Sequence, residues 1–350
     1  MSHPPLGLIE GFFGPPWPEA DRLAFAPFLQ NNDFQFYIYA PKADPYLRKK
    51  WREPWPSEFR QKMAALSRRF RAHQVQFGVG LSPFELHKIA KQEGKALLQT
   101  KLAQLEEAGI DWLGLFFDDM PLHEGLAHAQ LEAIEIVRGA TKARVIFCPA
   151  FYTPDPILEK VFGKRPEHYW EEIRAAPKEI EFAWTGPKVI SEDIPLEHLR
   201  ETGNLLGRKP FLWDNLFAND GPRNCKFLKL RPPTGRTTAA LEASNGWAWN
   251  PMNQAHLAQL VLFASLQAAV KHQPPEAALQ SSFRALCSRP LAEFLLAHGQ
   301  EWLTAGLDQL DLQKKKVWIE QLRQWNEPVA REIEQWLAGA YVVGAECLTD

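Results

Sequence analysis

The sequence predicts an eight-stranded parallel β-barrel surrounded by helices, a (β/α)8 or TIM barrel, followed by a C-terminal helical region. Short apolar runs alternate with amphipathic stretches along most of the chain. The runs are apolar almost throughout, as expected of strands that a parallel sheet buries on both faces. Eight of them fall within about 270 residues, which matches a (β/α)8 barrel better than an open doubly wound sheet.

Eight segments are expected to form the barrel strands, and four stretches between or after them have helical periodicity. The expected strands are 6–13, 34–40, 75–81, 112–117, 144–151, 180–184, 210–213 and 246–249. The helical stretches are 58–72, 95–108, 130–139 and 253–271. No glycine-rich phosphate-binding loop follows the first strand, because Pro15 and Pro16 lack the amides that such a loop uses.

Pro274 and Pro275 mark the expected boundary between the barrel, residues 1–273, and a helical extension, residues 274–350. Apolar spacing in the extension predicts helices over 291–298, 300–305, 313–324 and 329–337. The extension contains no cluster of polar residues typical of a site. We therefore expect it to pack on the barrel or on a second subunit, for which it offers a homodimer surface.

The composition is that of an ordinary globular protein, with 45% apolar and 23% charged residues. A net charge of −2 without a basic segment argues against nucleic acid and against a membrane surface, and no apolar segment is long enough for a membrane span. The four cysteines are scattered, which argues against a zinc site and a disulfide scaffold, and no cofactor is expected. No signal peptide is visible, so we expect a cytoplasmic protein.

Asp118 and Asp119 directly follow the apolar run 112–117. Ionised carboxylates next to apolar bulk are costly unless they are paired, hydrogen-bonded or functional. Two adjacent carboxyl groups also move each other's pKa values apart, which suits acid–base chemistry near neutral pH. A turn or a helix cap is the alternative explanation for such a pair.

Polar and aromatic residues also follow the other expected strands, at the end where (β/α)8 barrels carry their active sites. Carboxylates, amides, a lysine and aromatic rings together suit a polyhydroxylated ligand with an apolar ring face. No histidine stands directly at a strand end, and His123, the nearest, has no second histidine at ligand spacing, so neither a histidine metal site nor a hydrolase triad is expected. The residues at these ends include Gly11, Lys42, Tyr152, Trp213, Asn215, Asp220 and Asn250.

Each of these residues also has a structural explanation. Lys42 is equally typical of a solvated loop, and Asn215 and Asp220 of turns or caps. Tryptophans at strand ends also fill barrel cores, an explanation that applies to Trp184, Trp213 and Trp249. These explanations do not predict that polar residues recur at the same end of successive strands, and this recurrence indicates a single site.

Five segments carry motifs in a distinctive order: 9–17 (IEGFFGPPW), 39–42 (YAPK), 117–119 (FDD), 184–187 (WTGP) and 213–220 (WDNLFAND). Together they resemble glycoside hydrolase family 84, the β-N-acetylglucosaminidase family that includes protein O-GlcNAcases. The resemblance covers residues 7–253, nearly the whole expected barrel. Phe13 stands where many members of the family have tyrosine, so a hydroxyl contact is absent at that position.

The resemblance implies a retaining, substrate-assisted hydrolysis of terminal β-linked N-acetylglucosamine, in which the 2-acetamido oxygen attacks the anomeric carbon and forms an oxazoline. It implies that Asp118 orients and polarises the acetamido group, that Asp119 acts as general acid and then as base, and that Tyr152 donates to the acetamido oxygen. Trp213 is implied as a wall of the acetamido pocket and Asp220 as the contact of the distal hydroxyls. The full set of implied substrate contacts is Gly11, Lys42, Trp213, Asn215, Asp220 and Asn250.

Two other functions are open at this point. One is a catalytically silent barrel that binds the same sugar. The other is a hydrolase whose aspartate pair holds a divalent metal ion, although no second acidic cluster or phosphate-binding loop supports it. The expected partner is a carbohydrate or glycoprotein, and the aglycone is equally open: O-linked N-acetylglucosamine on Ser/Thr of proteins, peptidoglycan-derived sugars, chitin-type oligosaccharides and hyaluronan fragments share the same terminal ring. Tolerance of N-acetylgalactosamine is also undecided.

Overall fold

Eight parallel strands close into a barrel in the computed structural model, which describes residues 3–344. Each strand pairs with the next in chain order, and β8 returns to pair with β1 in the register Leu8↔Trp249. The predicted (β/α)8 fold is therefore confirmed. The strands are β1 (Leu6–Glu10), β2 (Phe36–Tyr39), β3 (Gln76–Leu81), β4 (Trp112–Phe116), β5 (Arg144–Cys148), β6 (Glu181–Trp184), β7 (Phe211–Asp214) and β8 (Gly246–Trp249).

The first and fifth strands are shorter than predicted. β5 ends at Cys148 because Pro149 has no N–H group for the sheet ladder. β1 ends at Glu10, and the backbone then turns away from the sheet, with the amide of Phe13 donating to the Asp220 carboxylate at 2.8 Å. Gly11 and Phe13 therefore line the mouth of the barrel instead of extending its wall.

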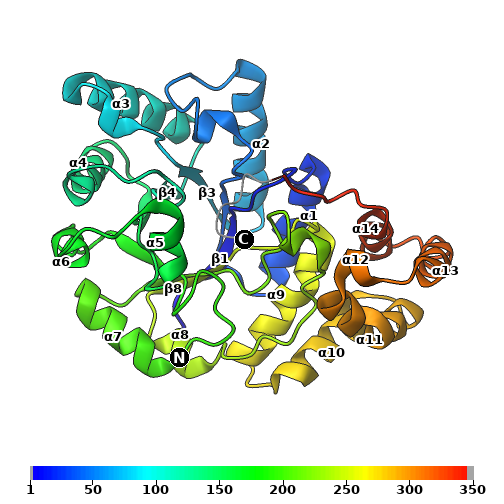
Figure 1. Ribbon diagram of the computed structural model, residues 1–350. Helices are drawn as coiled ribbons and strands as arrows, with labels where there is room; N and C mark the ends of the chain where they lie inside the picture. The colour runs from blue at the N-terminus through cyan, green and yellow to red at the C-terminus, as the bar shows by residue number, and fades with distance from the viewer. Residues whose placement is uncertain (1–2, 345–350) are drawn as a thin grey trace.

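Helices form a ring around the strands (Figure 1). The four predicted helical stretches correspond to α2, α3, α4 and α9, although α3 and α4 each begin about one turn earlier than predicted. The barrel helices are α1 (Glu19–Asn31), α2 (Ser57–Ala72), α3 (Lys91–Glu107), α4 (Leu126–Arg138), α5 (Pro156–Phe162), α6 (Tyr169–Ile173), α7 (Leu196–Leu206), α8 (Thr238–Glu242) and α9 (Ala255–Ala269), with 3₁₀ turns η1 (Pro45–Leu47), η2 (Leu86–Lys88) and η3 (Asn224–Lys226).

The C-terminal helices gather on one side of the barrel, coloured from gold to red in Figure 1. The prediction of separate helices over 291–298 and 300–305 is wrong. They form one helix, because Gly299 is buried inside it and faces Leu230 instead of ending it. The helices are α10 (Pro275–Leu286), α11 (Arg289–Thr304), α12 (Gly306–Gln309), α13 (Leu312–Leu322) and α14 (Pro328–Leu337).

Polar contacts anchor the C-terminal helices on the barrel. The Glu332 carboxylate of α14 accepts from the backbone amides of His256 at 2.9 Å and Leu257 at 2.8 Å, in the first turn of α9. It thereby satisfies amides that have no partner within the helix, and burial raises the pKa of Glu332 to about 8. The Trp336 indole donates to the carbonyl of Cys225 at 3.1 Å. The division of the chain at residue 274 stays a prediction.

The chain that follows α14 reaches the mouth of the barrel. Val343 is buried together with Phe13 and Cys225 in a small apolar cluster. Gly14, which has a φ of +107°, leaves no room for a side chain here, because a Cβ atom would lie 2.8 Å from a methyl carbon of Val343. Segments from near both ends of the described chain thus meet beside the loop that follows β1.

No helix between residues 3 and 344 combines the length and the apolar character that crossing a membrane requires. Cys148, Cys225 and Cys287 carry free thiols. Cys347 lies outside the described residues.

A buried ion pair holds the end of β7. The Asp214 carboxylate accepts from Arg236 Nε at 2.9 Å and Nη2 at 2.6 Å, from the Trp247 indole at 3.1 Å and from the backbone amide of Leu216 at 3.0 Å. Both charged side chains are fully buried, and the Arg236 guanidinium also donates to three backbone carbonyls. This network fixes the turn after β7, which carries two of the predicted site residues.

We expect Arg236→Met to lower the free energy of unfolding by about 3–5 kcal/mol, because it leaves the Asp214 carboxylate buried without its counter-charge. Arg231→Met is the matched control, since Arg231 pairs at 3.2 Å with Glu192, whose side chain is exposed. Arg231→Met should lower the free energy of unfolding by less than about 1 kcal/mol. Urea unfolding followed by circular dichroism measures both, and equal losses would contradict the structural role of the Asp214–Arg236 pair.

Candidate active site

The nine residues predicted for the site line one cavity at the carboxyl ends of the strands, here called the active-site cavity. Apart from Trp213, which lies in β7, they come from the loops after β1, β2, β4, β5, β7 and β8, which a closed barrel brings to a common rim. The free volume is about 50 Å³. The nine residues are Gly11, Lys42, Asp118, Asp119, Tyr152, Trp213, Asn215, Asp220 and Asn250.

Asp118 and Asp119 share one cation. The Lys42 ammonium forms an ion pair with Asp118 Oδ2 and lies 3.8 Å from Asp119 Oδ2, and all three side chains are at most 10% exposed. The Oδ1 atom of each aspartate is buried and has no hydrogen-bond partner among residues 3–344. Two acceptor atoms therefore remain for a ligand, which a pure turn or cap role would not require.

The pKa of Asp119 is raised, chiefly because burial disfavours the charged carboxylate, and the neighbouring charge of Asp118 adds to the effect. The positive charges of Lys42 and Arg48 oppose the increase. Asp119 therefore keeps its proton to a higher pH than an exposed aspartate does. A carboxyl group of this kind suits proton donation near neutral pH.

Arg48 was not predicted as a site residue, yet it holds the backbone that carries Asp119. Its Nη2 donates to the carbonyl of Asp119 at 2.8 Å, where the backbone has an uncommon left-handed φ of +55°. The guanidinium also lies over the ring of Phe13, 5.4 Å from its centroid. In the sequence, Arg48 belongs to a charged run that looks like a solvated loop, so only the folded chain reveals its position.

Trp213 forms one wall of the active-site cavity. Its ring packs on Phe116 with centroids 4.7 Å apart, and it is 4% exposed. A Cβ atom on Gly11 would lie 2.5 Å from Trp213 Cζ2, so the chain after β1 can pass the indole only with glycine at this position. The role of Gly11 is thus to let the backbone pass close to the Trp213 indole.

Amide and carboxylate groups form another part of the rim. Asn250 donates to Asn215 Oδ1 at 3.0 Å, and Asn215 donates to the carbonyl of Val189 at 2.9 Å. Asn250 Oδ1 is buried and has no hydrogen-bond partner within residues 3–344. Burial raises the pKa of Asp220 to about 6, although the amide of Phe13 donates to its carboxylate. The rim therefore offers acceptors suited to sugar hydroxyl or amide groups.

The structural explanation holds for two of the three strand-end tryptophans. Trp249 is fully buried between Trp247 and Phe34, with centroid distances of 5.7 Å and 5.8 Å. Trp184 is 1% exposed, and its indole donates to His198 at 3.0 Å. Both contribute to the core, and only Trp213 reaches the active-site cavity.

Within residues 3–344, the group of side chains with the geometry of a metal site is Asp21, His256 and Glu332, whose ligand atoms lie within 4.8 Å of one another. It stands where α14 meets the barrel, outside the active-site cavity. Both carboxylate oxygens of Glu332 already accept amides at the N-terminus of α9, where the helix dipole disfavours a cation. We assign this group a structural role.

A family model described as beta-N-acetylglucosaminidase matches residues 6–295. The chain belongs to this family. The match confirms the resemblance to glycoside hydrolase family 84 and extends beyond the barrel into α11.

Curated relatives and a solved structure agree with this family. The chain is 31% identical over 256 residues to the protein O-GlcNAcases of Rattus norvegicus and Mus musculus, covering 70% of this chain and 28% of each relative. The chain thus spans less than a third of their length. A solved mutant of the Thermobaculum terrenum O-GlcNAc hydrolase is 27% identical with a TM-score of 0.77, and the alignment covers 95% of this chain and 73% of that one.

We expect Gly11→Ala to displace Trp213, because the added Cβ atom overlaps the indole. Tryptophan emission should shift to longer wavelength, and binding of N-acetylglucosamine, followed by calorimetry, should weaken about tenfold or more. Gly203→Ala in α7 is the control, since its Cβ atom would meet its nearest neighbour at 3.8 Å. Unchanged emission and binding in Gly11→Ala would contradict the close contact between Gly11 and the Trp213 indole.

Proposed function

We propose that the chain is a retaining exo-β-N-acetylglucosaminidase that removes terminal β-linked N-acetylglucosamine by substrate-assisted catalysis. The observation that carries the proposal is the pair of buried aspartates at the end of β4, which share Lys42 and each keep one unpartnered oxygen. Family membership and the position of all nine predicted residues along one cavity support it.

The position of the two carboxyl groups favours a nucleophile supplied by the substrate. An enzyme nucleophile and an acid must flank the glycosidic bond, with carboxyl groups about 5 Å or more apart on opposite faces of the sugar. Asp118 and Asp119 are neighbours in the chain, with Cα atoms about 3.8 Å apart, and both contact the same ammonium. They therefore approach the sugar from one side, which leaves the attack to the 2-acetamido oxygen.

Each catalytic residue then has a distinct role. Asp118 accepts the acetamido N–H and stabilises the positive charge of the oxazoline. Asp119, whose pKa is raised by burial, protonates the leaving oxygen and later takes a proton from the attacking water. Tyr152 donates its hydroxyl to the acetamido oxygen. The Lys42 ammonium also lines the active-site cavity, and its three donors can serve a sugar hydroxyl as well as the aspartates.

The position of Lys42 argues against the alternative of a divalent-metal hydrolase. A metal ion bridging Asp118 and Asp119 would need the space that the Lys42 ammonium occupies. A bridging ion would also have to lie close to that positive charge.

We propose O-linked N-acetylglucosamine on serine or threonine of proteins as the substrate, because the rat and mouse relatives are named protein O-GlcNAcases. The homodimer through the C-terminal helices remains a prediction, and the exposed side chains of Leu312 and Val317 on α13 support such a surface. The cytoplasmic location also remains a prediction.

We expect wild-type protein to release 4-nitrophenol from 4-nitrophenyl N-acetyl-β-glucosaminide and not from the β-glucoside, which lacks the acetamide. Asp118→Asn should lower kcat for every N-acetylglucosaminide. Asp119→Asn should lower kcat/KM by about 10²–10⁴ for poor leaving groups and much less for activated ones, because only the former need an acid.

These assays separate the candidate functions. EDTA should leave the rates unchanged. If wild-type protein binds N-acetylglucosamine without hydrolysing the substrate, the enzyme hypothesis is rejected in favour of the catalytically silent sugar-binding barrel.

The proposed acid role of Asp119 predicts a decline of kcat/KM with rising pH. The protonated form is present below the pKa of Asp119 and is lost above it. Arg48 lowers this pKa, so Arg48→Met should move the decline to higher pH, whereas Arg48→Lys, which keeps the charge, should leave it near the wild-type position. A decline at the same pH in all three proteins would count against Asp119 as the acid.

A further inference from the structure

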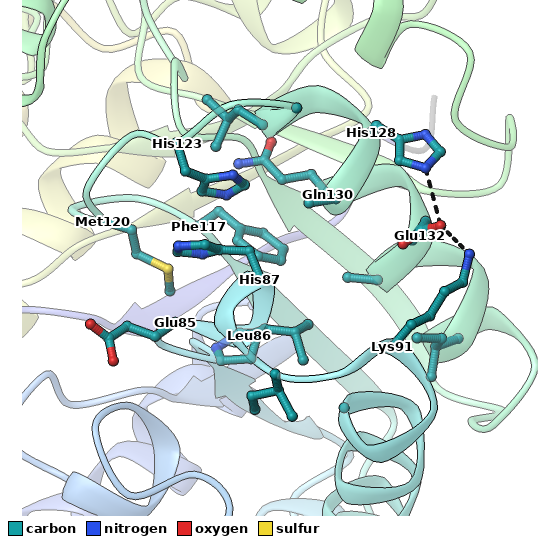
Figure 2. A pocket seen from close by; sticks show the side chains of 18 of the residues that line it. Glu85, Leu86, His87, Lys91, Phe117, Met120, His123, His128, Gln130 and Glu132 are labelled. Carbon is teal, nitrogen blue, oxygen red and sulfur yellow. Dashed lines mark hydrogen bonds and ion pairs between the residues drawn. The ribbon is translucent and has the colours of Figure 1, made fainter.

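A second and larger cavity lies beside the catalytic strand end, on the outer side of the barrel between α3 and α4 (Figure 2). Its volume is about 510 Å³, within the usual range of ligand sites. We call it the outer cavity. Its apolar lining includes Leu86, Ile89, Phe117, Met120, Ala129 and Ile136.

The outer cavity and the active-site cavity share one wall, residues 117–120. Phe117 and Met120 line the outer cavity, whereas Asp118 and Asp119 line the active-site cavity. Successive Cα atoms lie about 3.8 Å apart. The outer cavity therefore begins one residue beyond the proposed acid.

A buried donor in the outer cavity lacks a partner. Gln130 is 1% exposed, and its Nε2 has no hydrogen-bond partner within residues 3–344. The Tyr169 hydroxyl accepts the backbone amide of Ala150 at 3.0 Å and donates to Gln130 Oε1 at 2.6 Å. The nitrogen of Gln130 is then left for an acceptor in the outer cavity, which it lines (Figure 2).

The rim of the outer cavity is polar and carries both signs of charge. His87 and His123 stack with ring centroids 3.7 Å apart. Partial burial and the neighbouring His123 lower the pKa of His87. On another side, Glu132 pairs with Lys91 and His128 (Figure 2). An apolar interior with one free donor and a mixed rim suits a neutral ligand that carries an acceptor.

We propose that the outer cavity binds an apolar side chain and a neighbouring carbonyl group of a peptide aglycone. The proposal rests on the proposed function, because Asp119 protonates the oxygen that links the sugar to the aglycone, which places the aglycone on the acid's side of the sugar. Each peptide residue spans up to about 3.6 Å, so a side chain a few residues from the glycosylated serine or threonine reaches the outer cavity. Gln130 Nε2 donates to the peptide carbonyl.

The test compares kcat/KM for synthetic peptides that carry one O-linked N-acetylglucosamine, with leucine or alanine at each of the three positions on either side of the glycosylated serine. Ala129→Trp fills the outer cavity. Glu135→Trp adds the same ring to the exposed surface of α4, outside the outer cavity. The chromogenic N-acetylglucosaminide, which has no peptide, reports the basal activity of each protein.

Wild-type protein and Glu135→Trp should prefer leucine over alanine by about tenfold at one position or more, as expected for burying a side chain. Ala129→Trp should lose this preference and keep the chromogenic activity within about twofold. The proposal is overturned if wild-type protein cleaves the chromogenic substrate but no glycopeptide, if it shows no preference for leucine, or if the preference survives in Ala129→Trp. Failure on the chromogenic substrate would instead reject the proposed function itself.

Discussion

The burial of two adjacent carboxyl groups at the end of β4 is the constraint on which the rest of the site depends. Such a pair is tolerated only where opposite charge or hydrogen bonds compensate it. Lys42 supplies the charge from the loop after β2, and Arg48 supplies a second positive group that holds the Asp119 carbonyl. These contacts compensate the burial of the two carboxyl groups only in part, since one oxygen of each aspartate lacks a hydrogen-bond partner within residues 3–344. The folded chain thus bears a cost that a substrate would relieve.

Two carboxylates at other strand ends have a purely structural role, and both accept several hydrogen bonds from the protein. Glu10, at the end of β1, accepts from Arg22, Tyr37 and the amide of Trp17. Asp214, at the end of β7, is equally satisfied through Arg236 and its neighbours. The sequence places all these carboxylates at strand ends alike. Their hydrogen-bond partners separate the groups that stabilise the barrel from those that face a ligand.

The fold and most of the rim were predictable because they depend on local patterns. Continuous apolar runs mark buried parallel strands, and closing the barrel brings every loop that follows a strand to one rim. The missed features depend on contacts between segments far apart in the chain. Arg48 reaches Asp119, His87 stacks on His123, and Gly299 continues a helix because of what it faces. No spacing in the sequence encodes such pairings.

The contact between Val343 and Phe13 has a consequence for how the protein comes into being. A ribosome synthesises all eight strands long before it reaches residue 343, so the barrel can close on the nascent chain while its mouth is still unfinished. The loop after β1, which carries Gly11 and Phe13, would acquire its final packing only once residue 343 leaves the exit tunnel. Catalytic competence would then follow the emergence of residue 343, later than the formation of the barrel.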